Sequence, residues 1–109
     1  MWVFTKQGFI AIVQHNTIQD CFQVKSRVTD PLEILWPHKE IEVIKWADYR
    51  FRITIPKEEV FSVLVERASM VDYTSFKDEC RGDADYHHAL VSVWSAMHSY
   101  QQMKEGFNG

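Results

Sequence analysis

The strongest constraint on the fold is a strict alternation of apolar and polar side chains between positions 49 and 55. The odd positions hold apolar side chains, which are Tyr49, Phe51, Ile53 and Ile55. The even positions hold polar ones, which are Arg50, Arg52 and Thr54. Because successive side chains of a β-strand point to opposite faces, this pattern predicts a strand with one buried and one solvated face. A sheet that is open on one face is typical of antiparallel architectures.

Three other segments are predicted to be strands. The clearest begins at Asp20, and its apolar phase consists of Phe22, Val24 and Val28. Its opposite phase is polar and consists of Gln23, Lys25 and Arg27. The strand that opens the chain is expected to run from Trp2 to His15, with a bend or bulge at Gly8. The remaining strand is expected over Ile41 to Trp46.

Two helices are predicted between and after these strands. The segment Thr29-Asp30-Pro31 starts the first, because a capping oxygen precedes a proline at the first helical position. Pro37 ends this helix after a few residues. The second helix is expected to open at Pro56 and to run to about Met70.

The C-terminal part of the chain is predicted to be helical. A helix of one or two turns is expected from Phe76 to Cys80, and a long one from Asp83 or Asp85 to about Met103. The long helix has a four-three-four-three spacing of apolar residues, which predicts a buried stripe. The members of the stripe are Tyr86, Leu90, Val93, Met97 and Tyr100.

The order of elements predicts an α+β fold. Moving the last strand of the ferredoxin-like order to the front produces strand, strand, helix, strand, strand, helix. We therefore expect a circularly permuted ferredoxin-like ββαββα domain with a four-stranded antiparallel sheet, two helices on one face and an amphipathic C-terminal helix. The sheet order would be first, second, fourth, third. Residues 1–105 are expected to form this single domain, and 106–109 a flexible tail.

Composition narrows the classes of function. The formal net charge of −3 argues against a generic nucleic-acid binder, which is usually basic. We find no export signal and no apolar stretch of about 20 residues, as a membrane span requires. Cys21 and Cys80 match no metal or redox spacing, so we expect both to be reduced in a cytoplasmic protein.

Four basic residues are the most informative polar feature. If the second and fourth strands are neighbours, Lys25 and Arg27 stand beside Arg50 and Arg52 on the face away from the first two helices. Like charges placed opposite one another across strands are destabilising, so something is expected to offset them. One interpretation is an anion-binding site, since arginine binds phosphates and carboxylates bidentately. The other is a solvated face whose arginines pair with carboxylates such as Glu42, or with the last helix.

Nucleic acid is not an expected partner on this evidence. Ferredoxin-like RNA binders stack bases on aromatic rings that project from the central strands. Here Phe22, Tyr49 and Phe51 fall on the apolar phase and are expected to face inward.

Metal binding and catalysis find little support in the spacing of residues. His87 and His88 are adjacent on a helix and point about 100° apart, so they do not chelate one ion together. We predict no metal site and no cofactor. The best alternative catalytic group is His88, Tyr49 and Asp72, with the histidine as acid or base.

Several segments resemble a family of small bacterial proteins with no assigned activity. The matching motifs are Met1-Trp2-Val3-Phe4-Thr5, Gly8-Phe9-Ile10-Ala11-Ile12-Val13-Gln14, Asp48-Tyr49-Arg50-Phe51-Arg52, Asp72-Tyr73-Thr74-Ser75-Phe76-Lys77-Asp78 and Val93-Trp94-Ser95-Ala96-Met97. The chain departs from the pattern at Thr74-Ser75, where the family has proline and asparagine, and at Phe51, where it has tyrosine. The resemblance implies no function.

We therefore interpret the chain as a non-catalytic binding or interaction module that self-associates. Its anion-receptive residues would be Lys25, Arg27, Arg50 and Arg52, and its partner an anionic ligand, another protein or a second copy. One alternative is a small enzyme with a pocket between the sheet face and the last helix. Another is a nucleic-acid accessory protein.

Overall fold

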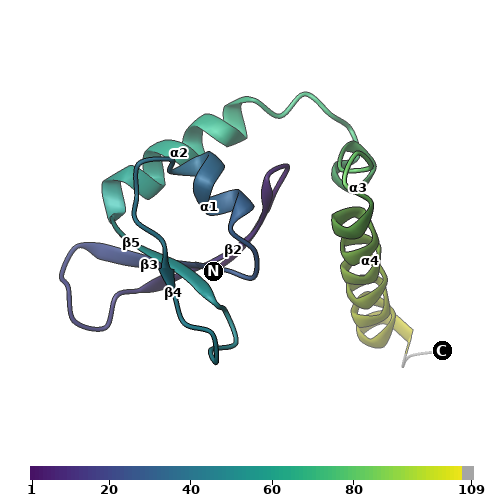
Figure 1. Ribbon diagram of the computed structural model, residues 1–109. Coiled ribbons are helices and arrows are strands. Elements are labelled where there is room, and N and C mark those ends of the chain that lie inside the picture. Colours follow the sequence, from purple (N-terminus) through teal and green to yellow (C-terminus); the bar gives the residue numbers. More distant parts are fainter. Residues whose placement is uncertain (107–109) are drawn as a thin grey trace. The chain divides into compact units, whose positions relative to one another are not determined.

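The chain consists of two compact units, Met1–Asp72 and Tyr73–Gly109. The computed structural model describes residues 1–106 (Figure 1). The first unit contains β1 (Trp2–Thr5), β2 (Gly8–Gln14), β3 (Cys21–Ser26), α1 (Asp30–Leu35), β4 (Glu42–Val43), β5 (Phe51–Pro56) and α2 (Lys57–Ser69). The second contains α3 (Phe76–Glu79) and α4 (Ala84–Glu105). Apart from Gly106, the predicted flexible tail lies outside the described residues.

The first unit is built on an open antiparallel sheet with the strand order β1-β2-β3-β5-β4. The prediction of an α+β fold with an antiparallel sheet and a C-terminal helix is confirmed. The prediction of four strands is wrong, because the sheet has five. Without β1, the order β2-β3-β5-β4 corresponds to the predicted order of first, second, fourth and third strand. The relation to a permuted ferredoxin-like fold stays a prediction.

The additional strand comes from the first segment, which is a hairpin and not one bent strand. Lys6 and Gln7 form a two-residue turn between β1 and β2. The Thr5 hydroxyl donates to the carbonyl oxygen of Gly8 at 2.9 Å and accepts from the Gln7 backbone N–H at 3.1 Å. Gly8 has a φ of +140°, which residues with a Cβ rarely adopt, so glycine allows the chain to reverse here.

Two other predicted strands are shorter than expected. β3 ends at Ser26, and Val28, which we predicted to face inward, is 55% exposed. β4 comprises only Glu42–Val43, because a turn at Lys45 and Trp46 and bends over 47–49 lead the chain away from the ladder.

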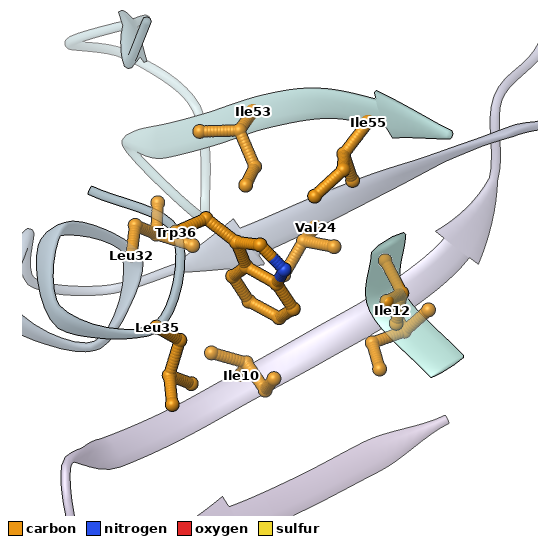
Figure 2. Close-up of a cluster of buried hydrophobic side chains, with 9 residues drawn as sticks. Ile10, Ile12, Val24, Leu32, Leu35, Trp36, Ile53 and Ile55 are labelled. Atoms are coloured by element: carbon orange, nitrogen blue, oxygen red, sulfur yellow. The ribbon is translucent and has the colours of Figure 1, made fainter. Parts of the chain in front are cut away.

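One face of the sheet is covered by α1 and α2, as predicted (Figure 1). The core cluster between them consists of Ile10, Ile12, Val24, Leu32, Leu35, Trp36, Ile53, Ile55 and Val60. Figure 2 shows the Trp36 ring in the middle of this cluster, among side chains from three strands. Its indole N–H donates to the carbonyl oxygen of Glu59 at 3.3 Å and so joins the end of α1 to α2.

The C-terminal helix begins as predicted, and its stripe differs from the prediction. The Asp83 side chain caps α4 by accepting from the Tyr86 N–H at 3.1 Å. Of the predicted stripe only Leu90 is buried, while Val93, Met97 and Tyr100 are 37%, 58% and 53% exposed. Within the unit, α3 is about 6 Å long and α4 about 33 Å, so α3 covers only a short part of it.

Replacing Gly8 by alanine is expected to destabilise the first unit. A Cβ at this position would lie 3.0 Å from Cγ of Pro31 and would require the unfavourable φ. We expect Gly8→Ala to lower the free energy of unfolding by about 1–3 kcal/mol, measured by urea denaturation. Gly82→Ala is the matched control, because nothing lies within 4 Å of its Cβ position. Equal stability of the two variants would contradict this account of the hairpin.

Candidate functional site

The open face of the sheet carries a row of side chains that crosses all five strands. The partners in the row are Trp2, Ala11, Lys25, Arg52 and Glu42, each opposite the next. They point away from α1 and α2 because their neighbours along each strand, such as Val24 and Ile53, lie in the core.

Lys25 and Arg52 face each other directly at the centre of this row. Among residues 1–106, neither forms an ion pair with a carboxylate. Glu42, the expected partner, lies opposite Arg52 in the β4–β5 ladder but forms no ion pair with it within the described chain. Two like charges therefore face each other, and no carboxylate of residues 1–106 lies within ion-pair distance of either.

The Arg52 guanidinium is held in place by the backbone. One terminal nitrogen (Nη2) donates to the carbonyl oxygen of Tyr49 at 2.7 Å. Its Nε is buried and has no hydrogen-bond partner in the part of the chain that the structure describes. The group is thus oriented, and within residues 1–106 its Nε–H has no acceptor.

Arg27 differs from Lys25 and Arg52 because it has a carboxylate partner. Its Nη1 lies 3.0 Å from Oδ1 of Asp48 and donates to the Asp48 carbonyl oxygen at 3.2 Å. The hydrogen bond to the Asp48 side chain raises the pKa of the guanidinium. The same group lies over the Tyr49 ring, 4.3 Å from its centroid. Tyr49 therefore contacts Arg27 through its ring and Arg52 through its backbone.

Arg50 lies just outside the ladder. The β3–β5 pairing ends at Ser26 and Phe51, so Arg27 and Arg50 are not cross-strand partners. Arg50 is exposed, and its carbonyl oxygen accepts from the Ile44 N–H at 2.8 Å. The structure thus pairs two of the four predicted basic residues directly and places the other two where the ladder ends.

An aromatic cluster that the sequence pattern did not predict lies on the same face. Phe4 and Phe9 are cross-strand partners with stacked rings whose centroids are 4.6 Å apart. The Trp2 ring meets Phe9 edge-on at 5.6 Å, and the Tyr49 ring lies 6.3 Å from Phe9. The missed signal was the break at Lys6-Gln7-Gly8, which separates two short apolar runs as a hairpin turn does.

The prediction that three central aromatics face inward is wrong for one of them. Phe22 and Phe51 pack against the core cluster. Tyr49 precedes β5 and lies in a bend, so the alternation of the strand does not set its direction. Its ring packs against Phe9 and Arg27 on the open face.

The alternative catalytic residues are spread over both units. Tyr49 and Asp72 belong to the first unit, and no hydrogen bond joins them in the described part of the chain. His88 is an exposed residue of α4 in the second unit. Residues 1–106 contain no group of three or more His, Cys, Asp or Glu side chains arranged to hold a metal ion. In the same range, no helix combines the length and apolar character needed to cross a membrane.

Comparisons with known proteins return no relative of this chain. No family model, no curated protein and no solved structure matches it. The family resemblance noted in the sequence therefore stays a prediction.

Removing the charge of Lys25 is expected to stabilise the free protein. Lys25→Gln keeps most of the side chain and removes the repulsion from Arg52, which at such a cross-strand position costs about 0.2–1 kcal/mol. Urea denaturation at low ionic strength is expected to show a gain of this size. The gain should shrink near 1 M salt, where the Debye length is about 3 Å.

Arg27→Gln is the matched variant with the opposite expectation. It breaks the ion pair with Asp48, whose side chains are 53% and 78% exposed, so we expect a loss of about 0–1 kcal/mol. A loss of stability in Lys25→Gln as well would show that the Lys25 charge is already neutralised.

Proposed function

We propose that Met1–Asp72 is a non-catalytic binding module whose open sheet face takes up an anionic ligand. The observation that carries the proposal is the direct pairing of Lys25 with Arg52, in which neither has a carboxylate partner among the described residues. A bound anion would neutralise both groups. Arginine can also meet a phosphate or carboxylate with two parallel hydrogen bonds.

The distribution of charge over the first unit supports this proposal. The helix layer carries five carboxylates, which are Asp30, Glu33, Glu58, Glu59 and Glu66. It carries two cations, Lys57 and Arg67. The open face has the reverse balance, with Lys25 and Arg52 at its centre. An acidic chain can therefore still present a positive surface to an anion.

The four basic residues have different parts in the proposed site. Asp48 already neutralises Arg27, which instead packs on the Tyr49 ring. Lys25, Arg50 and Arg52 are the groups that would contact the anion.

Binding of an anion is tested by thermal denaturation with inorganic pyrophosphate and with heparin. Because a ligand that binds only the folded state stabilises it, a concentration of about 100 times Kd adds about 2.7 kcal/mol and raises Tm. We expect a rise for the parent chain and no rise for the double variant Lys25→Gln/Arg52→Gln.

The control for this experiment removes the same number of charges from the helix layer. Lys57→Gln/Arg67→Gln lowers the net charge equally but leaves the open face intact. It should respond to both anions as the parent does. An equal loss of response in the two double variants would mean that overall charge, and not this site, governs binding.

A second candidate function is self-association through α4. Val93, Met97 and Tyr100 of the predicted stripe are exposed, and Trp94 beside them is 56% exposed. Their four-three spacing is the one that paired helices use. A second copy presents the same spacing, so a two-fold symmetric pair of α4 helices would bury both stripes.

Self-association is tested by sedimentation over a wide range of protein concentration. We expect a dimer whose fraction rises with protein concentration. Met97→Glu should raise the dissociation constant of this dimer at least tenfold, because the new charge would be buried in the interface. Ser95→Glu changes the opposite side of the helix and should leave the dimer intact. Unchanged circular dichroism would show that α4 still forms in both variants. A monomer at every concentration would exclude this function.

A further inference from the structure

We propose that the ligand of the open face is single-stranded nucleic acid, with its phosphates on Lys25 and Arg52 and its bases on the neighbouring aromatic rings. This inference rests on the proposed anion-binding function and names the ligand class. The juxtaposition that carries it is a cluster of Trp2, Phe4, Phe9 and Tyr49 beside an unneutralised basic pair. Phosphate-binding cations and base-stacking rings are the two components of surfaces that bind single strands.

The expectation against nucleic acid depended on aromatic rings that face inward. The β1–β2 hairpin removes that objection, because it brings Trp2, Phe4 and Phe9 to the open face. Tyr49 joins them from the bend before β5. The net charge of −3 is a second objection, and the separation of charge between the two layers answers it.

The dimensions of the open face suit an extended strand of several nucleotides. Trp2 on β1, Lys25 on β3 and Arg52 on β5 lie in one cross-strand row. Neighbouring strands are about 4.8 Å apart, so Trp2 and Arg52 are separated by three spacings, or about 14 Å. A strand that crosses the sheet along this row would meet a ring first and the cations next.

The rings are positioned before any ligand binds. Trp2 is 71% exposed, which leaves a ring face free for a base. Phe9 contacts both Phe4 and Tyr49, and the Arg27 guanidinium lies over the Tyr49 ring at 4.3 Å. These contacts hold the cluster in place, so little ordering of side chains is needed on binding.

A single strand fits this surface better than a duplex. A base presents its ring face only when it is not stacked in a helix. The open face carries its rings on β1, β2 and the bend before β5, and the two helices of the first unit, α1 and α2, cover the other face, so neither can enter a groove from the open face. Stacking accepts any base, so we expect weak sequence preference and strong dependence on salt.

The test is fluorescence anisotropy of the full chain with labelled oligouridylate and oligothymidylate of about 12 nucleotides, within the size range of known single-strand sites. Heparin, a blunt duplex and polyglutamate are measured beside them. We expect the single strands to bind more tightly than the duplex and polyglutamate. Lys25→Gln/Arg52→Gln should weaken binding of the single strands and of heparin by at least about tenfold.

Variants of Trp2 separate base stacking from charge. Loss of one stacked ring typically lowers the affinity for a single strand by a factor of about five or more. Trp2→Ala should therefore weaken oligonucleotide binding by this factor and leave heparin binding unchanged. Trp2→Leu keeps an apolar side chain without a ring and should behave like Trp2→Ala. Val65→Ala removes an exposed apolar side chain from α2, on the helix layer, and should bind as the parent does. Urea denaturation of each variant verifies that it folds.

Each outcome decides between the two proposals. If heparin and the oligonucleotides bind equally and Trp2→Ala weakens neither, the anion-binding function stands and the nucleic-acid inference is overturned. If polyglutamate binds as tightly as the single strands, the partner is an acidic protein and the inference also fails. If none of the polyanions binds, both proposals fall.

Discussion

The antiparallel ladder between β3 and β5 is the interaction on which the rest of the first unit depends. It joins six residue pairs at the centre of the sheet, from Cys21–Pro56 to Ser26–Phe51. One phase of this ladder brings Val24 against Ile53 in the core. The other phase brings Lys25 against Arg52 on the open face. Hydrophobic burial on one side therefore enforces the meeting of two cations on the other.

This coupling explains how an unfavourable pair can persist in a stable fold. Shifting the register by one residue would separate the charges, but it would turn the apolar side chains of the strand that moves, such as Val24 of β3, out of the core. Fully burying an aliphatic side chain of this size contributes about 1.5–3 kcal/mol, which exceeds the roughly 0.2–1 kcal/mol cost of a like-charge pair. The core thus holds the cations together, and the proposed anionic ligand would reduce their repulsion.

The β1–β2 hairpin adds aromatic rings to the open face. Without β1, the face would offer cations and few rings. With β1 beside β2, Trp2 and Phe4 join Phe9 on that face, next to the basic pair. Rings beside cations are the feature by which the proposed site would distinguish single-stranded nucleic acids from simple polyanions. The proposed ligand class thus depends on β1, which the sequence pattern did not distinguish from β2.

The alternation of residues 51–55 and of Phe22 to Lys25 predicted which side chains enter the core and which face solvent, because these properties depend only on neighbours along the chain. The proline in the first turn of α1 and the Asp83 cap of α4 were predictable for the same reason, although no side-chain cap bond forms at Thr29 within residues 1–106. The hairpin turn, the early end of β3 and the position of Tyr49 were not, because backbone conformation and pairing between distant segments decide them. Likewise, periodicity predicted a stripe on α4, and only the folded chain shows that most of it is uncovered. Within a regular strand, local sequence determines which face a residue occupies, while tertiary pairing determines where the strand ends and which neighbours a residue meets, and those neighbours define the site.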